Sequence, residues 1–297
     1  MIEYLLLASC FGFLAFLIPG RHRNYAAITG WIFIVLSLFS ELPAYFSENN
    51  FLYPAMAVLS VPFLYITIKY LLRGDSRVLH LTRAAAVACL IYFPFAFDEY
   101  AHIDGLGHWL INVVVNQILF LLNVMGYTVS IGCMDPVTDQ VLNSINCGSQ
   151  MLNVITGNGM SVEIILGCTG IQSIAIMLGV AAAVPTTVRQ KLYAFLLVTP
   201  TIYILNLLRN VFVILAYTGQ WFPYWPELAG NGQFGYESFF WAHNVIAEML
   251  ALVVLILIAY ALFLLIPKLG VFADELYHLY YGEMCKGFGR DIENYLK

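Results

Sequence analysis

Long apolar runs are the feature that most constrains the fold of this chain of 297 residues. A segment needs about 20 mostly apolar residues to cross a bilayer as a helix. Eight segments approach that length, approximately Ile2–Pro19, Tyr25–Phe46, Phe51–Leu72, Leu81–Phe97, Leu106–Tyr127, Ser161–Val184, Leu192–Tyr217 and Ser238–Ile266. Because no stretch between spans exceeds roughly 40 residues, there is no room for a soluble domain. The sequence therefore predicts an all-α polytopic integral membrane protein with a bundle of about seven or eight transmembrane helices.

The composition excludes several other classes of protein. Hydrophobic residues make up 61% of the chain and charged residues only 10%, whereas a soluble domain carries about 25% charged residues. An ordinary soluble enzyme and a disordered chain are therefore excluded. A nucleic-acid partner is excluded as well, since it would require a basic face and the formal net charge is −5.

The positions of Lys and Arg orient the helices, because cytoplasmic loops are enriched in both. Basic residues gather near positions 21–23, 69–83 and 189–191. We expect these loops in the cytoplasm, with the N-terminus outside. Residues 1–266 then form a single transmembrane domain, and residues 267–297, of mixed charge, form a cytoplasmic tail. The predicted location is the cell membrane, with several crossings.

The segment Leu106–Tyr127 is the least convincing span. His108, Asn112 and Asn116 recur every four residues and form a polar stripe on one helix face. We expect an amphipathic or re-entrant helix at the outer surface, which gives seven crossings. The alternative is a true span whose polar stripe faces the bundle.

Residues 128–160 are predicted to be an extracytoplasmic loop that covers a site in the outer leaflet. Their Gly, Asn, Ser and Asp content suits an ordered, hydrated loop. Cys133 and Cys147 both lie in it. Two alternatives are open for this pair: a disulfide, which an oxidising compartment would permit, and two free thiols.

One span carries a charged residue together with two amides. Arg209 lies three residues after Asn206 and directly before Asn210, so all three side chains share one helix face. A charge at the centre of a span costs roughly 2.5–3.5 kcal/mol, and such residues usually have a function. The alternative is that Arg209 joins helices through hydrogen bonds.

Two other spans hold a thiol and an imidazole. Cys168 lies between Gly167 and Gly170 and would share a helix face with Gln172. His243 precedes Asn244 in the last span. The alternatives are an inert small thiol and a hydrogen-bonded packing histidine.

The three groups are expected at a common depth. Cys168, Arg209 and His243 lie seven, eight and five residues from the outer ends of their predicted spans, or roughly 10, 12 and 8 Å deep at 1.5 Å per residue. A thiolate is a nucleophile, an imidazole can accept and return its proton, and a guanidinium can stabilise an anion. Together they are the parts of a cysteine-nucleophile site.

Three short motifs carry a family resemblance: Gly167-Cys168-Thr169-Gly170-Ile171-Gln172, Asn206-Leu207-Leu208-Arg209-Asn210 and Ala242-His243-Asn244. In this order the sequence resembles the exosortase/archaeosortase family of membrane-embedded cysteine transpeptidases. The resemblance implies that the protein cleaves a C-terminal tripartite sorting signal of the Pro-Gly-Phe (PGF-CTERM) type. It further implies that the new C-terminus of a surface protein, such as an S-layer glycoprotein, is transferred to a membrane lipid.

The resemblance also assigns roles. Cys168 would be the acyl-thioester nucleophile, Arg209 would stabilise the thiolate or the oxyanion, and His243 would be the general acid/base. The supporting or substrate-binding residues would be Gln172, Asn206, Asn210 and Asn244. No cofactor and no metal are expected. The partners would be surface proteins with a C-terminal signal helix and an acceptor lipid, and the active site would face the extracellular side.

Other readings remain. A transporter would use Arg209 and Glu248 as a pathway for a substrate or proton. An assembly subunit without chemistry would leave Arg209 unexplained. If the protein is an enzyme, water networked through Glu163 or Glu248 is an alternative to His243 as the base.

Overall fold

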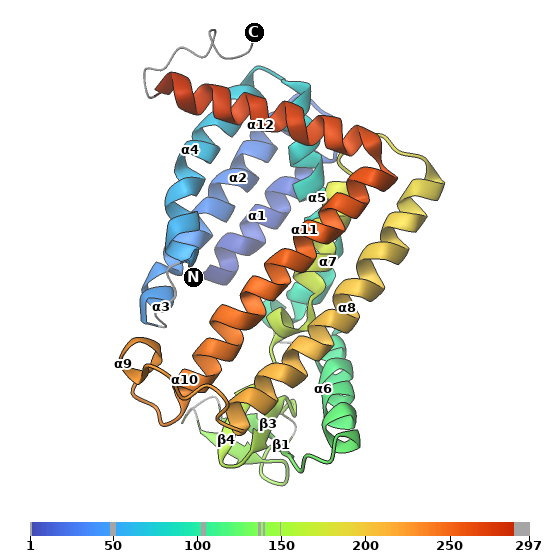
Figure 1. The fold of residues 1–297 in the computed structure, drawn as a ribbon. Coiled ribbons are helices and arrows are strands. Elements are labelled where there is room, and N and C mark those ends of the chain that lie inside the picture. The colour runs from blue at the N-terminus through green and yellow to red at the C-terminus, as the bar shows by residue number, and fades with distance from the viewer. Residues whose placement is uncertain are drawn as a thin grey trace. The chain divides into compact units, whose positions relative to one another are not determined.

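The computed structural model describes residues 2–47, 52–101, 105–135, 138, 140–148 and 150–287, and these residues are mostly helical (Figure 1). They form two compact units. The first comprises Met1–Ile91, Ala175–Leu197 and Leu257–Lys297, and the second comprises Tyr92–Ile174 and Val198–Ile256. The boundaries between the units fall inside helices α5 (Ser76–Ala101), α7 (Ile171–Ala181), α8 (Val188–Thr218) and α11 (Glu248–Leu265).

The first unit is built around α1 (Ile2–Phe16), α2 (Arg23–Ser40), the short α3 (Leu42–Ser47) and α4 (Leu52–Leu72). Its core is aromatic at the centre: the ring of Trp31 lies edge-on to Phe13 and to Phe63. The indole N–H of Trp31 donates to Thr82 Oγ1 of α5 at 3.1 Å, so this buried polar group is satisfied.

The segment expected as a solvated tail begins with a helix, α12 (Pro267–Gly287), while residues 288–297 lie outside the described part of the chain. Its Tyr280 ring stacks on Phe63, and the Tyr280 hydroxyl is hydrogen-bonded to Thr67 at 2.7 Å. Glu283 pairs with Lys69 of α4. These contacts hold α12 against α4 within the first unit.

The second unit combines helices with a small sheet. Its helical part comprises α6 (Leu106–Val124), the short helices α9 (Pro226–Ala229) and α10 (Tyr236–Phe239), and portions of α5, α8 and α11. The antiparallel sheet has the order β2 (Val141–Asn143), β1 (Ser130–Met134), β3 (Val154–Gly157) and β4 (Met160–Glu163). Ile118 and Leu122 of α6 are fully buried against residues of β3 and α8, which joins helices and sheet in one core.

The sheet corrects the expectation of a wholly helical protein with a loop at residues 128–160. The β3–β4 hairpin turns at Asn158–Gly159, where both residues have positive φ, 50° and 79°. Asn-Gly between two short segments that contain β-branched residues is a strong hairpin signal, because both residues tolerate the left-handed conformation that the turn requires. This signal was present in the sequence, and the loop expectation missed it.

The disulfide is confirmed for the two cysteines whose pairing was open. Cys133 of β1 is bonded to Cys147, with their Cα atoms 5.9 Å apart. The bond links β1 to the segment that follows β2, and it closes a short loop beside the sheet. It therefore restrains the region that leads into β3 and β4.

The expected span Ser161–Val184 is not one helix. It consists of the end of β4, a 3-10 turn η1 (Leu166–Thr169) and the 11-residue helix α7. Gly170 separates the turn from α7 with a φ of +79°, a left-handed conformation that interrupts a right-handed helix. Residues 161–170 therefore cross no membrane as a helix.

Among the described residues, six helices are long and apolar enough to span a bilayer, fewer than the seven or eight expected. They are Arg23–Phe46, Tyr53–Leu72, Ser76–Phe97, Leu106–Val124, Val188–Thr218 and Tyr236–Leu265. The first and seventh helices are apolar but shorter. The helix Leu106–Val124 is long and apolar enough to span a bilayer. That it lies at the outer surface and does not cross stays a prediction.

Candidate active site

Cys168 lies in the 3-10 turn η1, directly before α7. Its backbone N–H donates to Ile165 O at 2.9 Å. The prediction that Cys168 and Gln172 share a helix face is therefore wrong, because only Gln172 is helical. Gln172 Nε2 donates to Tyr92 Oη of α5 at 3.1 Å. A side chain on a short turn, unlike one in the middle of an α-helix, has neighbouring backbone that is open to a ligand.

Two amides of α8 hold this turn. Asn206 Nδ2 and Asn210 Nδ2 both donate to the backbone carbonyl of Cys168, at 2.6 and 2.7 Å. The two residues are one helical turn apart, so they reach the same carbonyl from one face of α8. They therefore replace the hydrogen bond that the carbonyl would have accepted in a continued helix.

Gly170 permits this close approach. A Cβ at position 170 would lie 3.2 Å from both Cβ and Cγ of Asn206, and the φ of +79° already disfavours a side chain. Both observations require glycine here. Gly170 is thus the residue at which the turn contacts α8.

Arg209 and His243 are in direct contact. Arg209 Nη2 lies 3.2 Å from His243 Nε2, and His243 Nδ1 lies 2.8 Å from Asn244 Oδ1. A guanidinium only donates, so Nε2 must be the accepting nitrogen. The remaining nitrogen, Nδ1, then carries the proton and donates it to Asn244. These contacts define a neutral imidazole in which Asn244 sets the tautomer.

A π-helix, η2 (Phe240–Ala247), carries His243 and Asn244. π-Helical turns are rare and often occur at functional sites, because the extra residue re-aims the side chains. The ring of Phe239 stacks on His243, with centroids 4.9 Å apart and planes 12° apart. The backbone irregularity and the stacked ring together fix the imidazole facing Arg209.

The thiol of Cys168 lies outside the six candidate spans. Burial raises its pKa above the ordinary value, while the backbone of Ile165 and the positive charge of Arg209 act in the opposite direction. The thiol is therefore protonated at neutral pH and needs a base before it can attack. In the described residues, the hydrogen bonds of Cys168 involve only its backbone.

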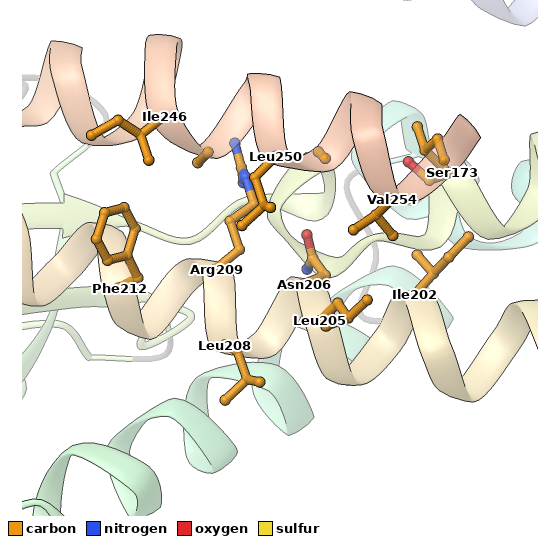
Figure 2. A pocket seen from close by; sticks show the side chains of 13 residues that line it. Ser173, Ile202, Leu205, Asn206, Leu208, Arg209, Phe212, Ile246, Leu250 and Val254 are labelled. Carbon is orange, nitrogen blue, oxygen red and sulfur yellow. The ribbon is translucent and has the colours of Figure 1, made fainter. Parts of the chain in front are cut away.

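A cavity of about 440 Å³ adjoins this group of residues (Figure 2). It lies between α8 and the η2–α11 segment, and in Figure 2 Arg209 and Asn206 extend from α8 toward that segment. Of the described residues that line it, three are polar: Ser173, Asn206 and Arg209. The cavity is thus an apolar space with one cation in its wall.

A second cavity, of about 650 Å³, lies beside α6. His108, Asn112 and Asn116 line it together with Gln150. The polar stripe of α6 therefore faces a cavity next to the sheet segment.

Each of the two acidic residues considered as alternatives interacts electrostatically with one member of this arrangement, Glu163 with Cys168 and Glu248 with Arg209. Glu163 of β4 is exposed and accepts a hydrogen bond from Asn153 Nδ2 at 3.1 Å. Glu248 is the first residue of α11. Among the ion pairs of the described residues, none joins Glu248 to Arg209.

Comparison with known proteins places the chain in a class of membrane enzymes. The model of the transmembrane exosortase family matches residues 4–242, which include Cys168 and Arg209 and end one residue before His243. The chain belongs to this family of membrane sorting transpeptidases.

Its relatives include two curated proteins. It is 29% identical to archaeosortase A of Natronomonas pharaonis over 262 residues, which cover 86% of this chain and 79% of that protein. It is 27% identical to archaeosortase A of Haloferax volcanii over 288 residues, which cover 93% and 89%. No solved structure matches the chain.

Proposed function

We propose that this protein is a membrane-embedded cysteine transpeptidase that cleaves a C-terminal tripartite signal of the PGF-CTERM type from surface proteins. The new C-terminus would be transferred to a membrane lipid. The observation that carries the proposal is the joining of the Cys168 turn to the face of α8 that also presents Arg209, which in turn contacts His243. The similarity to two archaeosortase A proteins over most of the chain supports the same substrate class.

In the first half of the reaction, Cys168 Sγ attacks the scissile carbonyl carbon. His243 Nε2 takes the thiol proton and returns it to the leaving amine, so that a thioester and a free C-terminal peptide result. The carbonyl oxygen gains negative charge in the transition state, and the Arg209 guanidinium donates to it. Asn206 and Asn210 are positioning residues, since they act through the backbone of Cys168.

The contact between Arg209 and His243 suggests an order of events. The Nε2 lone pair accepts from Arg209 in the resting site, so it is not available as a base. When the substrate oxygen draws the guanidinium away, Nε2 becomes free to accept the thiol proton. The base is thereby engaged only when a substrate is present.

The disulfide supports the orientation of the site. Disulfides persist in oxidising compartments, so Cys133–Cys147 favours an extracytoplasmic position for the sheet. β4 leads within five residues to Cys168. The site would then face outward in a multi-pass protein of the cell membrane, as the cytoplasmic basic loops also indicate.

The test is the C-terminal mass of a reporter that carries a C-terminal signal helix. We expect the wild type to give a shortened, lipid-bearing product and Cys168→Ala to give none. Cys285→Ala, which removes a free cysteine of α12, is the matched control and should process the reporter normally. A shortened product without lipid would show that the protein is a protease. Equal products from wild type and Cys168→Ala would show that Cys168 is not the nucleophile.

The Cys168→Ala variant also separates the transporter alternative, with flux in vesicles as the measurement. If Arg209 and Glu248 formed a transport pathway, Cys168→Ala would leave substrate-driven flux in vesicles unchanged. Among the described residues no ion pair joins these two, although the charge of Arg209 acts on Glu248.

A further inference from the structure

We propose that the cavity between α8 and α11 binds one hydrocarbon chain of the acceptor lipid, and that Arg209 holds the phosphate of its head group. This inference rests on the proposed transpeptidase function and assigns a place to its second substrate.

The cavity offers an apolar space along one face of α8. It holds about 440 Å³ and extends from Ile202 to Phe212, a length of roughly 15 Å at 1.5 Å per residue. One hydrocarbon chain is a slender apolar occupant that fits along this face. A signal helix is the competing occupant, and the experiment below separates the two.

The lining suits such a chain and leaves it a way in. Ile202, Leu205, Leu250 and Val254 give the part of the cavity beside Arg209 an apolar wall. Leu250 is 61% exposed although it lies on a candidate membrane span. A cavity whose apolar wall is exposed on a membrane-spanning helix is open to lipid from the side.

The charge of Arg209 selects the head group. Among the described residues that line the cavity it is the only charged one, and a guanidinium binds phosphate through two parallel N–H donors. Only one of its nitrogens, Nη2, contacts His243, so other N–H groups are available. The neighbouring Asn206 anchors Cys168, which brings the bound head group beside the thioester.

The transfer step balances with a head group that has a terminal hydroxyl or amine. Its oxygen or nitrogen attacks the thioester carbonyl carbon, a C–O or C–N bond forms, and the C–S bond breaks. Once the guanidinium has moved from Nε2 to the phosphate, His243 takes the proton of the attacking group and gives it to the departing sulfur. The products are the lipid-linked protein and the free Cys168 thiol.

A bulky substitution in the cavity tests the site. Val254→Trp fills the space, so it should slow transfer to lipid about tenfold more than it slows acyl-enzyme formation. The thioester at Cys168, detected by intact mass, should accumulate. Val253→Trp places the same ring on an exposed neighbour that does not line the cavity, and it should behave as the wild type.

Other outcomes of this experiment overturn the inference. Equal transfer rates for Val254→Trp and Val253→Trp would mean that no chain occupies the cavity. Loss of acyl-enzyme formation in Val254→Trp alone would make the cavity the signal-helix site. Absence of any Cys168-dependent acyl-enzyme in the wild type would instead overturn the proposed function.

Vesicle composition tests the head group. The wild-type enzyme would be placed in phosphatidylcholine vesicles doped with phosphatidylglycerol, phosphatidylethanolamine or diacylglycerol. We expect a lipid-linked product with at least one of the first two and none with diacylglycerol, which has a hydroxyl but no phosphate. Transfer to diacylglycerol at a comparable rate would refute the role of Arg209 in binding phosphate. Phosphatidylcholine alone, which lacks a nucleophile on its head group, is the background control.

Discussion

The two amides on the Cys168 carbonyl permit a quantitative test of how the nucleophile is positioned. Asn206→Leu and Asn210→Leu each remove one donor with little change in size. Each single variant leaves the carbonyl one partner, at 2.7 or 2.6 Å. The double variant leaves it without either of these amides, inside a part-buried site.

The expected magnitudes follow from these contacts. A neutral hydrogen bond contributes about 0.5–1.5 kcal/mol, but a buried acceptor without a partner costs about 1–3 kcal/mol. At 1.36 kcal/mol per factor of ten, each single variant should slow acyl-enzyme formation by up to about tenfold. The double variant should slow it by about a hundredfold, since a shift of about 1 Å in a nucleophile has that effect.

The assay is single-turnover acyl-enzyme formation with a signal-helix substrate, read by intact mass. A positioning role predicts a lower maximal rate with an unchanged half-saturating substrate concentration. Asn123→Leu, on an exposed residue of α6, controls for loss of an amide elsewhere. If the double variant acylated at the rate of the wild type, or if only substrate affinity fell, the positioning role of the amides would be refuted.

Four further predictions follow from the structure. Arg209→Lys should lower the acylation rate about a hundredfold, because a point charge cannot replace a forked donor; a silent variant in the reporter assay would reduce Arg209 to a structural role. Gly170→Ala should cost about 1–2 kcal/mol of stability, because alanine strains the left-handed conformation; an unchanged thermal midpoint would contradict this. Cys133→Ser should cost about 3 kcal/mol, because the bond closes a loop with a sequence separation of 14 residues; unfolding with and without reductant measures it, and equal midpoints would count against it. The rate of Cys168 alkylation should still rise with pH above the pH at which an ordinary thiol is fully ionised, because burial raises the pKa of this thiol. A rate that is already constant at acidic pH would show that the thiolate is present without substrate.

Hydrophobicity alone determined most of the helices, because a span must satisfy its backbone internally and expose apolar side chains to lipid. Helical spacing also placed Asn206, Arg209 and Asn210 on one face of α8, since residues three and four apart are neighbours in any helix. The sequence therefore predicted which side chains lie together wherever the backbone conformation was regular.

The sequence-based prediction was wrong around Cys168, because the backbone there is irregular. An apolar run from Ser161 to Val184 looks like a helix, yet pairing of β4 with β3 removes its first residues. Gly170 then adopts a left-handed conformation next to α8. Whether a glycine interrupts a helix depends on what packs beside it, and the sequence does not contain that information.

The sequence by itself thus determined that the chain is a membrane protein and which residues are candidates for its chemistry. Only the tertiary structure decided how the candidate groups meet. It joined the Cys168 carbonyl to two amides 38 and 42 residues away and placed Arg209 against a histidine 34 residues away. Hydrogen bonds between segments so far apart depend on how the helices and the turn pack, and no periodicity along one segment reports that packing.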